Sequence, residues 1–326
     1  MPAEWEPHAA TWAAWPFDDE EWRGFLAPAR EEYAAVLRRL SAFEPVELLV
    51  HDQDTEDDAR HRLEGCDVRF HRCPLDDVWL RDNGPIFVRR EDGSIHLTHW
   101  RFNAWGQKYD YSLDARAPET IARVLGARRV EIDLVMEGGS LETDGTGLCL
   151  TTRQCLLHPK RNRGVDAAEL QRALHRYLGL DRVIWLERGL EGDHTDGHID
   201  TLTRFVAPGK VVTSIAGQGD SNHDLLQENF HQLKSYGLEV VKLPLPQERR
   251  ELEGARLPMT YANFYIANGI VLVPLYGDRK DDEAMHVLGK AFPGRLVEGF
   301  PARAIITSGG AFHCLTQQQP AGALAR

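Results

Sequence analysis

The sequence predicts an α/β fold built from about five copies of one unit, in which two strands are followed by a helix and a third strand. Three observations predict it: strand pairs joined by turn signals, helical periodicity between the pairs, and a spacing of roughly 50 to 65 residues between units. A chain of 326 residues has room for about five units if one is assembled from both chain ends. A closed, propeller-like ring is favoured, because closure covers edge strands that an open array would expose.

Four segments have the pattern of a hairpin, with two short β-type runs around a tight turn. Two of the turns are Asp92-Gly93 and Asn268-Gly269, and Asn-Gly is the strongest short-range hairpin signal. The four hairpins span residues 86–98, 139–151, 198–215 and 262–274. Each would supply the first two strands of one unit.

Helical periodicity fills the stretches after the hairpins, and short β-type runs follow it. The predicted helices span residues 118–125, 166–178, 222–236 and 281–291, and the strand-like runs include residues 183–186 and 238–243. A doubly wound sheet is the alternative α/β arrangement, but its parallel crossovers need one strand per helix and this chain offers three. We therefore predict a single domain over residues 1–326.

The composition is that of a globular protein, with 42% hydrophobic and 27% charged residues. No apolar run approaches the roughly 20 residues of a membrane span, and the acidic, aromatic N-terminus is unlike a signal peptide, so we expect a cytoplasmic protein. Five cysteines without a secretion signal argue against a disulfide framework, and their spacings do not match a zinc site. The net charge of −12 argues against nucleic acid and fits small cationic ligands or plain solubility.

A polar side chain stands at the start of each unit, in apolar or glycine-rich surroundings. These residues are Asp82, Glu137, His198 with Asp200 close by, Asn263 and Cys314. They follow one another at intervals of roughly 50 to 65 residues, which matches the repeat. Each has an ordinary structural interpretation, such as a turn at Asp82. Equivalent positions of a ring face one central funnel, however, so we expect a shared site there.

Two local patterns shape the expected geometry of this site. His198 and Asp200 are two residues apart, and on a strand such residues share a face and would act on one ligand. Cys314 follows a Gly-Gly pair, whose second member, Gly310, lets backbone and ligand approach closely. If the next stretch is extended, His313 would point away from the side of Cys314.

The two aspartates and the cysteine together favour one chemistry. Asp82 and Asp200 suit guanidinium, a planar cation with a fork of N–H donors. A thiolate is the nucleophile, and a protonated His198 or a cationic substrate would lower the pKa of Cys314. His198 could then protonate the leaving ammonia and activate water, while Trp79 could stack on the cation.

Five segments of the chain carry a resemblance to a known family. They read MPAEWEPHAATWAAWP, DVWLRDNGPIFV, MEGGSLETDGTGLCLTT, TDGHIDTLTRFVAPGKVV and GGAFHCLTQQQP. In order and spacing, over nearly the whole chain, they resemble the agmatine deiminase family, which is grouped with the bacterial type of peptidylarginine deiminase. The resemblance implies the guanidine-modifying superfamily and its five-bladed, pentein-like α/β propeller. It also implies hydrolysis of agmatine to N-carbamoylputrescine and ammonia, with no metal or organic cofactor.

The resemblance also implies roles for single residues. Cys314 matches the family nucleophile, which forms a covalent amidino-cysteine intermediate, and His198 matches the general acid and base. Asp82 and Asp200 match the carboxylates that hold the guanidinium, and Glu137 matches the acid that orients the histidine. The other residues expected to bind substrate are Trp79, Asn263, Asp193, His194 and Gly310.

The stretch before the catalytic histidine departs from the family. Family members read Asn-Asp-Glu-Thr-Asn-Gly-His, and that glutamate reaches the distal amine of agmatine; this chain has His194 in its place. Histidine is a weaker, pH-dependent partner for an ammonium group. Asp193 or Asp196 would have to take over that task, and free arginine or a peptidyl C-terminal arginine are alternative substrates.

Three other functions compete with a deiminase. A metal hydrolase could use His194, Asp196, His198 and Asp200 as ligands, although His-x-x-x-His suits a metal only on a helix and Gly197 favours a turn here. A non-enzymatic binder of guanidines or polyamines would not need the thiol of Cys314. An amidinotransferase would pass the amidino group to an amine instead of water. The sequence is also compatible with a homodimer, but it locates no interface.

Overall fold

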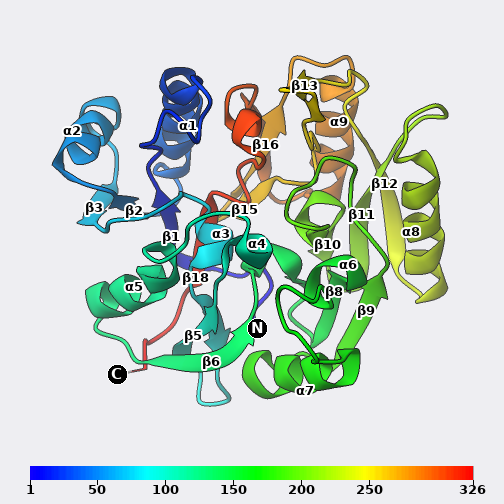
Figure 1. Cartoon of the computed structure of the whole chain (residues 1–326), viewed down its shortest axis with the longest axis horizontal. Coiled ribbons are helices and arrows are strands. Elements are labelled where there is room, and N and C mark those ends of the chain that lie inside the picture. Colours follow the sequence, from blue (N-terminus) through cyan, green and yellow to red (C-terminus); the bar gives the residue numbers. More distant parts are fainter. Residues whose placement is uncertain (326) are drawn as a thin grey trace.

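The computed structural model describes residues 1–325 and shows a mixed α/β fold. Within that range the strands form five related sheets and a separate two-stranded ribbon (Figure 1). Each of the five sheets begins with an antiparallel strand pair and continues with a parallel strand, and one of them carries a second parallel strand. The predicted unit of two strands, a helix and a third strand is therefore confirmed.

Four of these sheets are three-stranded, and each has a helix between its second and third strands. The strands are β4 (Ile86–Arg89), β5 (Ile95–Arg101) and β6 (Arg129–Val135); β7 (Glu142–Thr143), β8 (Leu148–Thr152) and β9 (Arg182–Leu186); β10 (Thr203–Ala207), β11 (Lys210–Ile215) and β12 (Glu239–Pro244); β15 (Tyr265–Ala267), β16 (Ile270–Leu275) and β17 (Leu296–Pro301). The helices are α5 (Ala117–Leu125), α7 (Ala167–Leu178), α8 (His223–Ser235) and α9 (Asp281–Ala291).

The fifth sheet joins the two ends of the chain, as the repeat predicts. Its order is β18-β1-β2-β3, and β18 runs antiparallel to β1, so that the last and first strands lie side by side in Figure 1. Its elements are β18 (Thr316–Pro320), β1 (His8–Ala14), β2 (Val46–Val50), β3 (Val68–Arg72), α1 (Leu26–Leu40) and α2 (Gln53–Arg62).

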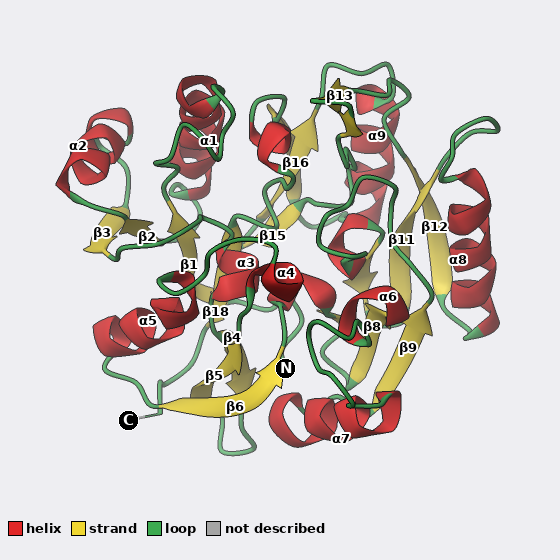
Figure 2. Cartoon of the chain, in the orientation of Figure 1, coloured by secondary structure: helices red, strands yellow, loops and turns green. Residues whose placement is uncertain are grey.

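The crossover helices lie at the periphery in Figure 2, whereas the short helices α3 and α4 lie near its middle. α7 shows why these helices form: Asp166 accepts a hydrogen bond from the Glu169 amide, and Gly179 ends the helix with φ of 67°. The remaining elements are α3 (Leu80–Asn83), α4 (Ala104–Gln107), α6 (Arg153–Leu156), the 3-10 segments η1 (Asp114–Arg116), η2 (Gly138–Ser140), η3 (Ile199–Thr201) and η4 (Ile305–Ser308), and the ribbon of β13 (Glu251–Leu252) and β14 (Ala255–Arg256).

One local prediction is wrong. His198 and Asp200 do not lie on a strand, because the positive φ of Gly197 (87°) starts a turn and η3 follows it; β10 begins only at Thr203. The stretch around His313 is a turn, so the condition of an extended segment is not met there. Both places lie on loops that carry site residues.

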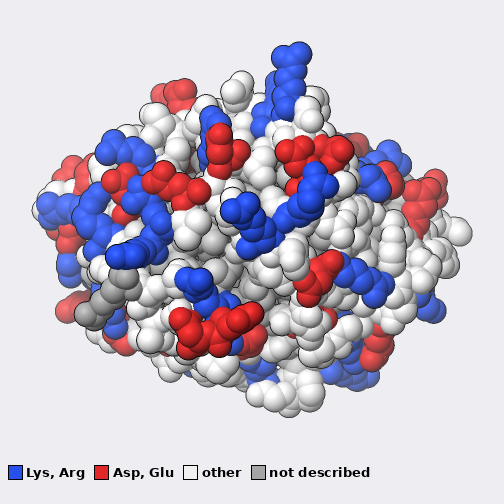
Figure 3. All heavy atoms as spheres, turned by 90° about the horizontal axis from the view of Figure 1, so that it is seen from below, with Lys and Arg blue, Asp and Glu red and all other residues white. Residues whose placement is uncertain are grey.

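The surface carries both signs of charge. In the view from below in Figure 3, Lys and Arg are interspersed with Asp and Glu over the whole face, with no continuous basic stripe. Among residues 1–325, none of the helices has the length and apolar character to cross a membrane.

Candidate active site

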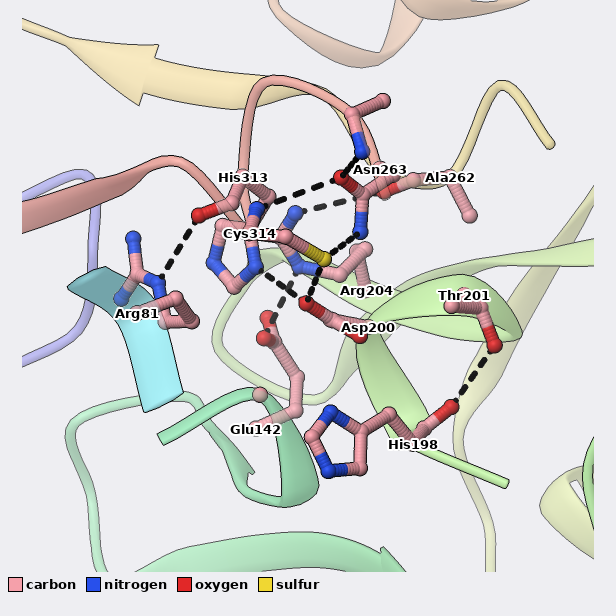
Figure 4. Close-up of polar contacts among 12 residues, drawn as sticks. Arg81, Glu142, His198, Asp200, Thr201, Arg204, Ala262, Asn263, His313 and Cys314 are labelled. Carbon is pink, nitrogen blue, oxygen red and sulfur yellow. Dashed lines mark hydrogen bonds and ion pairs between the residues drawn. The ribbon is translucent and has the colours of Figure 1, made fainter. Parts of the chain in front are cut away.

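The residues predicted at the starts of the units converge in the structure, on loops and short helical turns at the ends of strands. Asp82 lies in α3, Glu137 precedes η2, Asp200 lies in η3 just after His198, Asn263 precedes β15 and Cys314 precedes β18. All of them are buried. In Figure 4 the Cys314 sulfur points between Asn263 and Asp200, with the His198 ring across from them.

Asn263 holds the cysteine in place. Its Oδ1 accepts the backbone N–H groups of Ala311 at 3.1 Å and of Cys314 at 3.3 Å. Because the amide oxygen faces two donors, the amide nitrogen must face the sulfur, and Nδ2 donates to Cys314 Sγ at 3.1 Å. This bond favours a thiolate over a thiol.

Negative charge surrounds Cys314. Burial, and then the charges of Asp200 and Asp82, raise the pKa of the Cys314 thiol well above its usual range, against the opposing bond from Asn263. Asp200 Oδ2 lies 3.5 Å from Sγ. A cation held between the two carboxylates would oppose these effects, so the site is suited to a cationic ligand that helps to ionise its own nucleophile.

Asp200 uses its two oxygens differently. Oδ2 accepts a hydrogen bond from His313 Nδ1 at 2.7 Å, whereas Oδ1 is buried and has no partner among residues 1–325. Burial alone would raise the pKa of Asp200, but the bond and charge of His313, helped by His198 and Arg204, hold it below its usual value. Asp200 is therefore an ionised carboxylate with one free, buried oxygen.

Asp82 lies on the other side of His198. Its Oδ1 accepts the Gly139 backbone N–H and its Oδ2 accepts Trp105 Nε1, each at 2.9 Å. Burial, and the neighbouring Asp200 and Glu137 charges, raise the pKa of Asp82 to about 6, although the charge of His198 opposes this. Asp82 is thus ionised at neutral pH and protonated in mild acid.

His198 is fully buried between two carboxylates. Nδ1 lies 3.6 Å from Asp82 Oδ2 and Nε2 lies 3.8 Å from Glu137 Oε2, and neither nitrogen makes a hydrogen bond within the described residues. Burial would lower the pKa of His198, but Asp82, followed by Cys155 and Glu137, brings it well above its usual value. The imidazole therefore holds a proton that it can donate.

Glu137 is fixed by an arginine that the sequence analysis did not single out. Arg161 Nε bonds both Glu137 oxygens at 2.8 and 3.0 Å, while its Nη1 bonds Asp196 Oδ2 at 2.7 Å and its Nη2 bonds the Thr195 carbonyl at 2.6 Å. Burial would raise the pKa of Glu137, and Arg161 and His198 reverse this. Asp196 is tied up by Arg161 and by Lys108, at 2.8 Å.

Asp193 is also occupied. Its Oδ1 accepts the Thr195 backbone N–H at 2.8 Å and its Oδ2 accepts the His198 backbone N–H at 3.1 Å. These bonds shape the turn that carries His198, and they use both oxygens of the carboxylate. Within the described residues, Asp193 therefore supports the backbone of the histidine.

A pocket of about 130 Å³, here called the outer pocket, adjoins the site: Trp79, Trp105, His194 and Gly309 are part of its lining, and Trp105 bonds Asp82. A Cβ on Gly310 would lie 2.6 Å from the Trp79 ring and 3.0 Å from Cys314 Cβ, so that glycine is required where tryptophan and cysteine meet. Gly309, at φ of 101°, lies against the His194 ring, and His194 meets Trp105 edge to face with centroids 5.9 Å apart.

The metal set predicted as an alternative does not form. Among residues 1–325, the one group of three close donor atoms comes from Glu137, Cys155 and His198. Its Glu137 is already paired with the Arg161 guanidinium, and a divalent cation placed there would be repelled by that charge. These residues therefore do not fit a metal centre.

Sequence reasoning missed several residues that shape the site. Gly139 donates to Asp82 from within the Gly-Gly pair after Glu137, so the pair itself was a usable signal. Trp105 reaches Asp82 from a backbone with positive φ (53°), an unusual conformation for tryptophan that no pattern predicts.

A buried thiol between carboxylates, with a histidine that carries a proton, defines a thiol-dependent site for a planar cation.

Comparison with known proteins identifies the family. Residues 1–320 match the model of the Porphyromonas-type peptidyl-arginine deiminase family. Agmatine deiminases of Pseudomonas aeruginosa (strain LESB58) and Medicago truncatula are 37% and 38% identical; 98% of this chain is aligned in each case, with 95% and 96% of the relative. A Cys-to-Ser variant of C. jejuni agmatine deiminase with substrate bound superposes with a TM-score of 0.92 at 30% identity, over 99% of this chain and 96% of that one. The chain belongs to the Porphyromonas-type peptidyl-arginine deiminase family.

Proposed function

We propose that this protein hydrolyses agmatine to N-carbamoylputrescine and ammonia, through a covalent intermediate on Cys314. The observation that carries the proposal is the Cys314 sulfur, held by Asn263 and set 3.5 Å from Asp200. Relatives named agmatine deiminase, at 37% to 38% identity over almost the whole chain, support agmatine as the substrate.

In the proposed first half-reaction, the guanidinium lies between Asp82 and Asp200, and the free Oδ1 of Asp200 accepts one of its N–H groups. The added positive charge favours the thiolate of Cys314, which attacks the guanidinium carbon and forms a C–S bond. His198 gives its proton to one nitrogen of the tetrahedral adduct, and the C–N bond breaks as ammonia leaves.

In the second half-reaction the roles of His198 reverse. The neutral imidazole takes one proton from water, and the oxygen attacks the amidino carbon. The C–S bond then breaks to return the thiolate, the second proton of that water passes to solvent, and the ureido product is released. The 3.6 and 3.8 Å distances from His198 to Asp82 and Glu137 leave its nitrogens free to exchange protons with substrate and water. Glu137, fixed by Arg161, orients the ring.

The far end of the substrate lies in the outer pocket. Its carboxyl groups belong to Glu21 and Asp77, and neither forms an ion pair among the described residues. Burial raises the pKa of both, and with the Asp114 charge it brings the pKa of Asp77 well above its usual value, so Glu21 is the anion of this pocket. The two arginines that also line the pocket are occupied: Arg256 bonds Asp220, at 2.7 Å, and Arg23 lies 3.7 Å from Glu253. A distal ammonium group therefore fits the outer pocket better than a carboxylate group does. This favours agmatine over free arginine as the substrate.

We extend the proposal to the whole chain. The five sheets of like topology support a five-bladed α/β propeller, with residues 1–326 as one catalytic domain. The five cysteines are free thiols, which fits the cytoplasm as the place of the reaction. The partner is the small guanidine substrate, and a homodimer is the proposed assembly.

Ammonia release tests the function. Purified protein is given agmatine, free arginine or a peptide with a C-terminal arginine, with and without a strong chelator, beside Cys314→Ala. We expect turnover of agmatine that survives the chelator and is lost in Cys314→Ala, with a mass increase on Cys314 when the reaction is quenched early. Turnover of only another guanidine would replace the substrate, and release without a Cys314 adduct would contradict the mechanism. Transfer of the amidino group to an added amine, without formation of the ureido product and ammonia, would identify a transferase.

A further inference from the structure

Asp200 is held in place by His313, to which the sequence analysis assigned no role. His313 Nδ1 donates to Asp200 Oδ2 at 2.7 Å, and its other nitrogen, Nε2, lies 2.7 Å from Glu4 Oε2. All three side chains are buried. Figure 4 shows His313 beside Cys314, with its bond to Asp200 dashed.

Glu4 is anchored as firmly as the aspartate. Its Oε1 accepts the Ile266 backbone N–H at 2.8 Å and lies 3.0 Å from Arg204 Nη2, and Arg81 Nη2 reaches Oε2 at 3.3 Å. Burial alone would raise the pKa of Glu4, but Arg204, His313 and Arg81 hold it well below its usual range. Glu4 is thus a buried anion that faces His313.

The hydrogen-bond inventory then determines the state of His313. Both ring nitrogens face oxygens of ionised carboxylates, which can only accept hydrogen bonds. The geometry therefore points to a hydrogen on each nitrogen, so that His313 donates to both carboxylates. The other charged groups packed around this cluster are Arg81, Arg204 and Glu142, with Arg204 Nε bonded to Glu142 Oε2 at 2.9 Å.

We propose that His313 and Glu4 are positioning residues of the reaction. Glu4 keeps a hydrogen on both nitrogens of His313. His313 in turn orients Asp200 so that Oδ1 faces the guanidinium, and it neutralises part of the negative charge beside the Cys314 sulfur. The inference rests on the proposed function only for the identity of the cation. In this arrangement Asp200 Oδ1 binds the guanidinium and Oδ2 binds His313. Through Glu4, the N-terminal segment supports the active site. Neither residue touches the reacting atoms.

The test uses Glu4→Gln and His313→Gln in the full chain. The glutamine at position 4 keeps an acceptor for Arg204 and the Ile266 amide but removes the anion that faces His313. The control is Glu6→Gln, in the same segment, where the carboxylate pairs with the half-exposed Arg89 at the surface. For each protein, kcat and KM for agmatine are measured, together with the pH midpoint for alkylation of Cys314 by iodoacetamide, followed by mass spectrometry.

For both test variants we expect kcat/KM to fall by roughly 10- to 100-fold, with a clear rise in KM, and the alkylation midpoint to move to higher pH. The double variant should lose little more than either single variant, because the two residues act through one contact. Glu6→Gln should match the wild type. An unchanged KM and alkylation midpoint in a folded variant would overturn the proposal, since a purely structural defect lowers only the folded, active fraction.

The alkylation arm separates this inference from the proposed function. If the wild type releases ammonia from no guanidine, the function fails, yet a shifted alkylation midpoint in Glu4→Gln would still support the relay to Asp200. If circular dichroism shows that Glu4→Gln does not fold, the alkylation midpoints of Glu4→Asp and His313→Gln are compared with the wild type instead. A wild-type midpoint in every folded variant would contradict the relay even in an active deiminase.

Discussion

Gly139 makes room for two side chains of the site by having none of its own. A Cβ there would lie 2.6 Å from His198 Nδ1 and 2.8 Å from Asp82 Oδ1, closer than carbon approaches such atoms. We expect Gly139→Ala to lower kcat/KM for agmatine by roughly 100-fold or more, because it displaces the histidine or the aspartate. Steady-state kinetics, with circular dichroism to verify folding, check this.

Gly289 provides the matched control. It lies in helix α9, and a Cβ at that position would meet no atom within 4 Å. Gly289→Ala should leave kinetics unchanged and raise the free energy of unfolding by about 0.4–1 kcal/mol. Full activity in Gly139→Ala would show that the site has space that the structure does not predict.

Asp82 sets the acid limit of activity. Burial, followed by the charges of Asp200 and Glu137, raises its pKa to about 6 against the influence of His198, and only the ionised form holds a guanidinium. Ionisation of Cys314 already makes kcat/KM for agmatine rise with pH near pH 7, and we expect the profile to become steeper, by up to tenfold per pH unit, below about pH 6. A profile whose slope does not change down to about pH 5 would contradict this role. Asp82→Asn should be inactive at every pH.

At the scale of the element, the loop before α3 depends on one buried carboxyl. Asp114, the first residue of η1, accepts the backbone N–H groups of Asp76 at 2.8 Å and of Asp77 at 3.0 Å on one oxygen. Burial raises its pKa to about 7, against the effect of these bonds, whereas an unfolded chain gives about 3.9. The folded state therefore binds a proton more tightly, so this contribution to stability is present at low pH and is lost as pH rises from about 4 to about 7.

Asp114→Asn tests this linkage. The amide oxygen can accept the same two N–H groups but does not titrate. We expect the variant to lose less stability than the wild type between about pH 5 and about pH 8, measured as the free energy of unfolding in urea. Equal losses in both proteins would mean that Asp114 does not titrate in this range.

The sequence predicted elements better than the loops between them. Alternation and Asn268-Gly269 identified the β15–β16 hairpin, and Gly269 takes the positive φ of 76° that such a turn needs. His198 was assigned to a strand because β-branched alternation follows it, but Gly197 and η3 bend the chain there. Loop conformation depends on distant partners, such as the Asp193 bond to the His198 amide, which local periodicity does not encode.

At the scale of the whole molecule, the repeat predicted where the site gathers, because a fixed spacing places equivalent residues together. It could not predict Glu4, which meets His313 across almost the entire sequence. Contacts of that kind depend on how the chain ends pack, and neither residue stands at a unit start. The resemblance to a family pointed to residues that converge at the site, whereas the contacts that support them depend on the packing of distant segments.

The overall charge makes a prediction about salt. The chain has a net charge of −12, and Glu21 lines the outer pocket, so a cationic substrate is attracted over several ångströms. We expect KM for agmatine to rise several-fold between about 10 mM and about 0.3 M salt while kcat changes little. Sodium chloride and choline chloride should act alike, because screening is not ion-specific. A KM that is independent of ionic strength would contradict this attraction.

The pairing of β1 with β18 also affects when the enzyme can fold during its synthesis. Glu4 and β1 leave the ribosome long before Cys314 and β18. A nascent chain can build the intermediate units in order, but its first strand lacks its neighbour and Asp200 lacks His313 until β18 has been made. Nascent chains that end before β18 should therefore be inactive.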